Sequence, residues 1–307
     1  MLGEIEIRNF QEGDMPLLGE LYNSVTSREN ATFWWVGDPD NWVNVFCAFE
    51  QGKMVAKGQV SIINIVPSGR SADSKHLIYL NLKTIQERES DHNLLELLYP
   101  YLYSRALELK ESLSQEHGTL LCVGNDSSEI TNSQFFIQQK GFHHKESLFR
   151  MRRDLNQSIP ELLISDDLPF KHWTMDSSQE ENEYLELEAA IWPDTPLGLE
   201  RLTQYKQNPL WTAMNVREED TIVGSLMAWR DEDGGVIEDV FVREPWRNRG
   251  IAKYLLTQAL SYLKDNGLES AELMVLTSND NALSLYESVG FQMIQEEVRY
   301  CVDLKNN

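Results

Sequence analysis

Hydrophobic residues in the second half of the chain recur with two periods, one typical of helices and the other of strands. Between residues 250 and 266 they repeat every three or four positions, and Gly267 follows where helices commonly end. Between residues 270 and 276 they alternate with polar residues, as in a half-buried strand. The pattern predicts helices at 180–191, 199–207, 250–266 and 281–288, and strands at 221–229, 236–242, 270–276 and 295–302. Alternating strands and helices of these lengths indicate a layered α/β domain.

A short pattern of residues recurs without gaps 149 positions further along the chain. The two copies are Gly141-Phe142, Arg150 and Asp154-Leu155, and Gly290-Phe291, Arg299 and Asp303-Leu304. Each copy follows a helix-like stretch and continues into a strand-like segment. Because the repeats of solenoid proteins are only ~20–50 residues long, a repeat of this length indicates two duplicated domains.

The length of 307 residues also suits two domains of ~100–200 residues each. Between the two copies, the periodic pattern is interrupted by Pro160, by the Asp166-Asp167 pair and by Pro169. We therefore predict an N-terminal domain at residues 1–157, a linker at 158–167 and a C-terminal domain at 168–307.

The chain is acidic, with 49 Asp and Glu residues against 27 Lys and Arg residues and a net charge of −22. Residues 1–160 contribute −6 and residues 161–307 contribute −16. This balance argues against nucleic-acid binding, because phosphate backbones are held by clustered Lys and Arg side chains. It favours a cationic or amine-bearing partner, with solubility as the alternative role of the charge.

The sequence gives no sign of a leader, a membrane span or a metal site. The first twenty residues include six charged side chains, and no apolar run approaches the ~20 residues that cross a bilayer. The three cysteines, Cys47, Cys122 and Cys301, are odd in number and widely spaced. We therefore expect a cytoplasmic protein with neither a disulfide framework nor a zinc site.

Basic residues gather around the start of the helix predicted at 250–266. Four of the twelve basic residues of the second half, Arg243, Arg247, Arg249 and Lys253, fall within eleven positions. The first amides of a helix have no partner within it, and the helix dipole adds partial positive charge there. Gly250 also allows a ligand to approach the backbone closely. The stretch therefore predicts an anion site, with an ordinary solvated helix start as the alternative.

This stretch resembles the acetyl-coenzyme A motif of the GCN5-related N-acetyltransferase (GNAT) family, Gln/Arg-x-x-Gly-x-Gly/Ala. Here it reads Arg247-x-x-Gly250-x-Ala252, directly after the strand that ends in Val240-Phe241-Val242. The segment 279–291 is similar to the family's second signature, Asn-x-x-Ala-x-x-Leu-Tyr-Glu-x-x-Gly-Phe. The two motifs, in this order, make residues 170–304 similar to the family, and the first half only in outline.

The resemblance implies two tandem α/β domains, each a mixed, largely antiparallel twisted sheet flanked by helices. It also implies acetyl-coenzyme A as the co-substrate. The backbone around Arg247, Asn248, Arg249, Gly250, Ile251 and Ala252 would cradle its pyrophosphate. Phe241 and Val242 would bind the pantetheine arm beside a bulge in their strand, and Asn279 would contact the pantetheine or the diphosphate. Tyr286 would protonate the departing thiolate, with simple packing as the alternative role.

The reaction also needs a base, because an amine with a pKa of ~10 is mostly protonated at neutral pH. The resemblance places a carboxylate in the strand before the motif, and Glu238 lies there. Ordered water is the alternative base, and a solvated acidic edge is the alternative role for Glu238. Asp239 is expected to alternate onto the opposite face of the strand.

The first half lacks the coenzyme motif. Residues 90–95, which align with the segment from Arg247 to Ala252, contain no glycine and place Asp91 where a diphosphate would lie. Counting back from Gly141, Ile137 takes the place of Tyr286. We therefore interpret the first half as a degenerate copy that has kept the architecture.

The sequence as a whole predicts an N-acetyltransferase that transfers an acetyl group directly from acetyl-coenzyme A to an amine of a small molecule or peptide. The acceptor is expected to be cationic, and the protein to be a monomer or homodimer. Two alternatives remain open: a non-catalytic acyl-coenzyme A sensor that binds another protein, and a transferase that uses a longer acyl donor.

Overall fold

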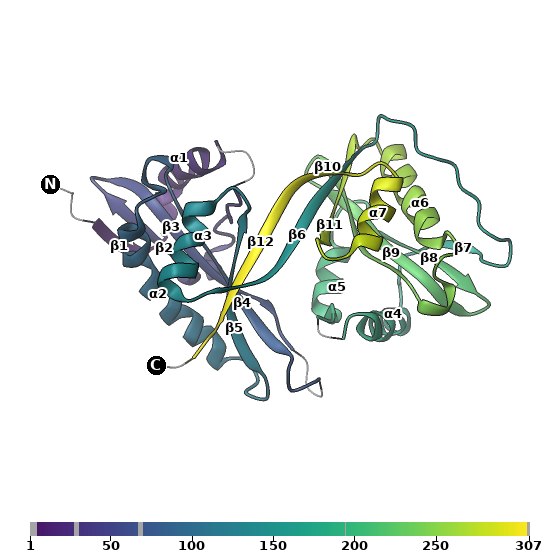
Figure 1. Ribbon diagram of the computed structural model, residues 1–307, viewed down its shortest axis with the longest axis horizontal. Coiled ribbons are helices and arrows are strands. Elements are labelled where there is room, and N and C mark those ends of the chain that lie inside the picture. The colour runs from purple at the N-terminus through teal and green to yellow at the C-terminus, as the bar shows by residue number, and fades with distance from the viewer. Residues whose placement is uncertain (1–4, 28–30, 67–69, 194, 306–307) are drawn as a thin grey trace. The chain divides into compact units, whose positions relative to one another are not determined.

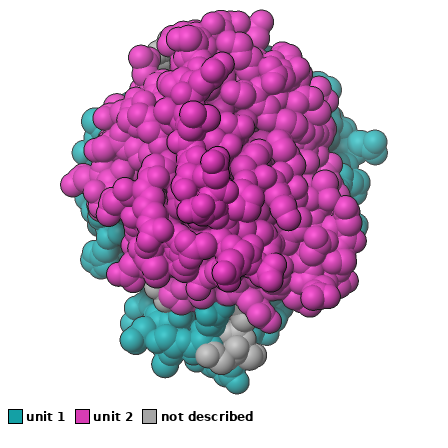
Figure 2. All heavy atoms as spheres, turned by 90° about the vertical axis from the view of Figure 1, so that its right-hand side faces the viewer, with its two compact units in different colours: residues 1–147, 297–307 teal, residues 148–296 magenta. Residues whose placement is uncertain are grey.

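The computed structural model describes residues 5–27, 31–66, 70–193 and 195–305. The chain forms two compact units, coloured separately in Figure 2. Unit 1 comprises residues 1–147 and 297–307, and unit 2 comprises residues 148–296. Each unit is an α/β fold with a mixed sheet of six strands (Figure 1), which confirms the predicted fold class.

Unit 1 orders its strands β1-β2-β3-β4-β5-β12, and only β4 and β5 run parallel to each other. Its elements are β1 (Ile5–Asn9), α1 (Met15–Thr26), β2 (Val45–Glu50), β3 (Lys53–Asn64), β4 (Lys75–Thr84), α2 (His92–Glu111), β5 (Gly118–Asp126), α3 (Ile130–Gln134) and a π-helix at Phe135–Gln139. The last strand of this sheet is β12 (Gln292–Asp303), from the far end of the chain.

Unit 2 orders its strands β6-β11-β10-β9-β8-β7, and only β10 and β11 run parallel to each other. Its elements are β6 (His143–Asp154), β7 (Phe170–Trp173), α4 (Ser178–Ile191), α5 (Gly198–Lys206), β8 (Thr212–Glu218), β9 (Thr221–Asp231), β10 (Gly234–Val242), α6 (Ile251–Asp265), β11 (Ser270–Leu276) and α7 (Asp280–Ser288). The predicted helices and strands of this half are confirmed, whereas β7 and β8 were not predicted.

Helices cover both faces of each sheet, because each helix buries one apolar stripe. In unit 2, α6 and α7 pack on one face, while Tyr184 of α4 and Leu202 of α5 join the core on the other. Gly235 lies under α6, where a Cβ would come within 2.6 Å of the Leu263 side chain. Gly58 plays the same part under α2 of unit 1, so close contact between strand and helix is a feature of both copies.

The two units exchange the strands that end the two halves of the sequence. Residues 148–154 of β6 pair with β11 in unit 2, and residues 297–303 of β12 pair with β5 in unit 1. Leu155 accordingly lies in the core of unit 2, and its repeat partner Leu304 in the core of unit 1. The predicted boundary at 158–167 therefore differs from the compact units. The spacing of the repeat could not reveal which sheet each final strand joins. The two repeated strands carry the same residue pattern, and each is compatible with either sheet.

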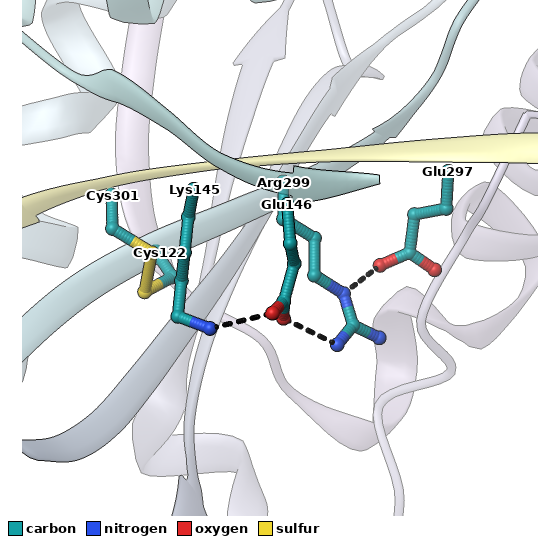
Figure 3. Close-up of a disulfide and its surroundings, with 6 residues drawn as sticks. All are labelled: Cys122, Lys145, Glu146, Glu297, Arg299 and Cys301. Atoms are coloured by element: carbon teal, nitrogen blue, oxygen red, sulfur yellow. Dashed lines mark hydrogen bonds and ion pairs between the residues drawn. A yellow bond between two sulfur atoms is a disulfide. The ribbon is translucent and has the colours of Figure 1, made fainter. Parts of the chain in front are cut away.

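The exchange brings together two cysteines that lie 179 residues apart. Cys122 on β5 and Cys301 on β12 are direct cross-strand partners and form a buried disulfide (Figure 3). The expectation of no disulfide is wrong for this pair, because it rested on spacing along the chain. Cys47 is a buried free thiol.

Ion pairs reinforce the same strand. Figure 3 shows Arg299 of β12 between Glu297, at 2.6 Å, and Glu146, at 3.2 Å, with Lys145 bonded to Glu146. The Arg299 guanidinium also lies 5.6 Å from the centre of the Tyr79 ring of β4. Disulfide, ion pairs and ring contact together hold the final strand in unit 1.

We predict that Cys301→Ser lowers the free energy of unfolding by about 3–5 kcal/mol, because the disulfide closes a long loop in the unfolded chain. Urea unfolding with and without reductant measures the change. Reductant should destabilise the wild type to a similar extent and leave the variant unchanged. Thiol titration of the denatured, unreduced wild type should find only Cys47, and a count of three thiols would contradict the pairing.

Candidate active site

The irregular strand β10 determines the geometry of the candidate site. A bulge between Glu238 and Phe241 shifts its register against β9, and Asp239 there has a φ of 53°. The described register between β10 and β11 contains two pairs, Gly235 with Ala271 and Val236 with Glu272. The bulge expected from the family resemblance is therefore confirmed. It interrupts strand pairing and re-aims the side chains that follow.

The loop from Arg247 to Ala252 joins β10 to α6 through a left-handed backbone. Gly250 is the N-cap of α6 with a φ of 79°, and Asn248 has a φ of 63°. A Cβ added to Gly250 would meet no atom within 4 Å, so the backbone there is open to approach. The Ile251 side chain is buried in the core, which leaves only its backbone available to a ligand, and Ala252 is half-buried.

The two arginines of this loop are exposed and held by backbone carbonyls. The Arg247 Nε donates to the carbonyl oxygen of Val242 at 3.1 Å. Arg249 donates to the carbonyl of Pro245 at 3.3 Å and lies 3.9 Å from the Glu218 carboxylate. Both guanidiniums thus remain beside the start of α6, where they add positive charge to that of the helix dipole.

Helix α7 presents the second motif. The Asn279 side-chain oxygen accepts a hydrogen bond from the Ala282 amide at 3.2 Å and so caps the helix. Tyr286 is buried, with its ring edge-on to Phe291 at a centroid distance of 6.0 Å. Burial, and then the nearby Glu238 carboxylate, raise the pKa of Tyr286 to about 12. The phenol is therefore protonated at neutral pH, and it lies within electrostatic range of Glu238.

Glu238 and Asp239 both face groups from α4 and α5. Asp239 accepts a hydrogen bond from the Tyr184 hydroxyl at 2.8 Å, and the charge of Glu238 acts on Tyr205. The expectation that these carboxylates lie on opposite faces is wrong, because the bulge breaks the regular alternation. Burial, followed by the charge of Asp239, raises the pKa of Glu238 to about 7, while Arg201 opposes the shift.

Sequence reasoning did not single out three residues of this site. Tyr184 is fully buried on α4, Tyr205 stacks on Trp229 at 4.6 Å, and Arg201 lies over the Tyr205 ring at 5.8 Å. Burial and then Glu238 raise the pKa of Tyr205 to about 12. The predicted helices at 180–191 and 199–207 contain all three, but no spacing motif marks them. Phe241 is buried against the same cluster, edge-on to Trp192 at 5.8 Å, whereas Val242 packs on the α6 side.

The corresponding places in unit 1 contain side chains of the protein itself. Asp91 is the N-cap of α2, where unit 2 has Gly250 as the N-cap of α6. Its carboxylate accepts from the Leu94 amide at 3.1 Å and pairs with Arg88. Near the ends of β4 and β5, the buried Lys83 ammonium pairs with Glu129 at 2.6 Å. Unit 1 thus places a carboxylate at its helix start and a buried ion pair near its two parallel strands.

The helix before the repeated Gly-Phe differs between the units by one residue. In unit 2 the Phe291 amide donates to the carbonyl of Tyr286, and in unit 1 the Phe142 amide donates to the carbonyl of Phe136. The π-helix at Phe135–Gln139 accounts for the additional residue. Phe136, which is buried, therefore takes the place of Tyr286, and the sequence assignment of the exposed Ile137 is wrong. This position of unit 1 has no hydroxyl.

Comparisons with known proteins agree with this geometry. Residues 173–291 match the model of the Acetyltransferase (GNAT) family. Acetyltransferase SG1711 from Sodalis glossinidius is 30% identical over 33% of this chain and 70% of that protein. Mycothiol acetyltransferase from Thermobispora bispora is 27% identical over 52% of this chain and 58% of that protein. L-ornithine N5-acetyltransferase NATA1 from Arabidopsis thaliana is 38% identical over 21% of this chain and 28% of that protein.

Solved structures show the same fold along the whole chain. A GCN5-related N-acetyltransferase from Sphaerobacter thermophilus matches with a TM-score of 0.78 at 18% identity, covering 100% of this chain and 98% of that one. A tandem GNAT protein from the clavulanic acid biosynthesis pathway matches with a TM-score of 0.68 at 12% identity, covering 99% of this chain and 100% of that one.

The fold and the candidate site define an α/β protein with a bulged strand and an open glycine at the following helix start. The chain belongs to the GNAT acetyltransferase family. Its match spans less than two thirds of the length of the ornithine and mycothiol acetyltransferases.

Within the described ranges no helix is long and apolar enough to span a membrane. The same ranges contain no group of three or more His, Cys, Asp or Glu side chains placed to hold a metal ion.

Glu238 should affect stability in a pH-dependent manner. Folding raises its pKa from 4.5 to about 7, so the folded protein binds more protons than the unfolded chain between these values. Glu238→Gln should therefore be more stable than the wild type at pH 8, by about 1–3 kcal/mol, and equally stable near pH 4. Urea unfolding across this range measures the difference. Glu186→Gln, which removes an exposed carboxylate from α4, is the matched control, and a Glu238→Gln variant that is less stable than the wild type at pH 8 would contradict the assignment.

Proposed function

We propose that this protein is an N-acetyltransferase that uses unit 2 to transfer an acetyl group from acetyl-coenzyme A to a cationic amine. One observation carries the proposal: a bulged strand presents Glu238 within electrostatic range of Tyr286, and after a short 3-10 turn at Glu244–Trp246 the chain reaches the open backbone at Gly250. An anion site, a candidate base and a candidate acid thus belong to one short stretch of fold. The similarity to an ornithine acetyltransferase and a mycothiol acetyltransferase supports the reaction class.

The residues of unit 2 fit the donor. The first amides of α6 and the left-handed backbone at Asn248 and Gly250 suit a diphosphate, and Arg247 and Arg249 add charge. Beyond Val236, the described register of β10 with β11 contains no further pair. Phe241 and Val242 pair with β9, and the β11-facing side of their main chain would bind the pantetheine amides, next to the Arg247 side chain on the Val242 carbonyl. Asn279, whose oxygen caps α7, would use its amide nitrogen toward the donor.

Glu238 would act as the base. An alkylammonium with a pKa of ~10 holds its proton at neutral pH, and a carboxylate whose pKa is about 7 is a much better proton acceptor than an ordinary Glu. A bulge amide near Phe241 would stabilise negative charge on the acetyl oxygen during attack. As the N–C bond forms and the C–S bond breaks, the amine nitrogen loses two protons. One ends on the sulfur and the other leaves through Glu238.

Tyr286 would assist the leaving sulfur. Its high pKa keeps the phenol protonated, so that it can donate a hydrogen bond to sulfur as negative charge develops there. A thiol has an ordinary pKa of ~8.5, well below that of this phenol. The hydrogen bond from Tyr286 to sulfur therefore accelerates the reaction before any proton is transferred. Tyr286 can act as the acid without becoming fully ionised.

Unit 1 would not bind the coenzyme. Asp91 places its carboxylate at the start of α2, where a diphosphate would be repelled, and the Lys83–Glu129 pair is buried near the ends of the parallel strands. Phe136 lacks the hydroxyl of Tyr286. We therefore propose that unit 1 is a structural copy. This role of unit 1 is the same whether the protein is a monomer or a homodimer.

Titration calorimetry of acetyl-coenzyme A tests the donor site. We predict one site per chain in the wild type and no detectable binding to Gly250→Glu, because the new carboxylate repels the diphosphate. Gly267→Glu is a matched control, since it alters a glycine of similar φ, 84°, at the opposite end of α6. Two sites would contradict the role of unit 1, and no binding to the wild type would exclude the transferase. Competition with longer acyl-coenzymes identifies the preferred donor.

Thiol release with a panel of amines tests catalysis. Tyr286→Phe should lower kcat by roughly 10²–10³-fold with little change in acetyl-coenzyme A affinity, because it removes one hydrogen bond made in the transition state. Tyr254→Phe, on the neighbouring helix α6, is the control. A Tyr286→Phe enzyme with full turnover would leave this residue a packing role. Coenzyme binding without turnover of any amine would favour an acyl-coenzyme A sensor.

A further inference from the structure

Asp239 is held in place from two sides. The bulge of β10 sets its backbone, with a φ of 53°, a conformation that side-chain-bearing residues adopt uncommonly. From α4, the fully buried Tyr184 donates its hydroxyl proton to Asp239 Oδ2 at 2.8 Å. Two separate elements thus fix this carboxylate, and Oδ2 is used for the anchoring hydrogen bond.

Asp239 is also one of two adjacent carboxylates in a poorly solvated place. Burial raises the pKa of both carboxyls, and the charge of Asp239 raises that of Glu238 further. Arg201 on α5 opposes the rise in pKa at both. Arg201 is exposed and contacts the face of the Tyr205 ring. A small cation at this point would be stabilised by both carboxylates.

The proposed reaction requires two different actions on its acceptor. An alkyl amine arrives as an ammonium ion and must first be held by a negative charge. It must then lose a proton to a base, and the base gives up its own negative charge when it accepts that proton. If a single carboxylate both holds the ammonium and accepts its proton, it loses its negative charge, and with it its attraction for the acceptor, at the moment of attack. A second, fixed carboxylate removes this conflict.

We propose that Asp239, positioned by Tyr184, binds the charged acceptor while Glu238 takes its proton. Asp239 is then the residue that selects alkylammonium acceptors over amines that are uncharged at neutral pH. This inference rests on the proposed acetyl transfer by unit 2, and it assigns the two adjacent carboxylates separate roles.

The test compares a charged and an uncharged acceptor in steady-state thiol release at pH 7.5. Butylamine is protonated at this pH and aniline is not. We expect Asp239→Asn to raise the KM for butylamine about 10–100-fold, the effect of losing one charge-assisted contact, with kcat within about threefold. The KM for aniline should change less than about threefold. Glu238→Gln should have the opposite effect: a lower kcat for butylamine and little change in its KM.

Two further variants separate a positioning role from general damage. Tyr184→Phe removes the anchoring hydrogen bond and should raise the KM for butylamine in the same sense as Asp239→Asn, but less. Glu186→Gln removes an exposed carboxylate from the same helix as Tyr184 and should change neither constant. An equal effect of Asp239→Asn on both amines, or a loss confined to kcat, would overturn the assignment.

A binding measurement keeps this inference separate from the reaction itself. If the wild type releases thiol with neither amine, the proposed transfer fails. Titration of butylamine into the protein saturated with coenzyme A then tests Asp239 alone. Binding that is weakened in Asp239→Asn but not in Glu186→Gln supports the anchoring role. Equal binding by the wild type and Asp239→Asn, or no binding to the wild type, overturns it.

Discussion

One extra residue in β10 is the constraint on which the candidate site depends. The bulge between Glu238 and Phe241 ends the regular alternation of the strand, so that two consecutive carboxylates face α4 and α5. The same irregularity accompanies the short parallel register of β10 with β11, in which the described pairs end at Val236. A strand with regular pairing would direct one carboxylate to each face and would satisfy its amides within the sheet. The placement of the two carboxylates and the irregular pairing of β10 therefore both follow from this bulge.

The two units differ at corresponding places of the same architecture. Each has a pair of parallel strands, a following helix and a glycine that lets the helix approach the sheet. At the helix start, unit 2 has only the backbone of Gly250, whereas unit 1 has the Asp91 carboxylate bonded to the helix amide. Beside the strands, the buried Lys83 of unit 1 donates to Glu129 and Asn125. Internal satisfaction of this kind stabilises a fold and removes the groups that a ligand would use.

Sequence patterns predicted most of unit 2, because its motifs are local. The loop at Gly250, the helix at 281–288 and the strand at 270–276 all depend on neighbours within a few residues. Contacts made between distant segments could not be predicted. The Tyr184–Asp239 hydrogen bond spans 55 residues, and the Cys122–Cys301 pair depends on which sheet receives β12. The π-helix before Gly141 misled a simple count by one residue, since a count along the chain assumes a regular helix.

The exchanged strand makes the order of synthesis matter for folding. Every strand of unit 2 has been translated once residue 276 of β11 is made, and its last helix follows by residue 288. Unit 1, although it comes first, lacks its sixth strand until residues 297–303 are translated. Domains usually fold in the order in which they leave the ribosome, and here the first unit must wait for the second. Until then β5 lacks its β12 neighbour and Cys122 lacks its partner, so completion of the unit 1 sheet and formation of its disulfide both require β12.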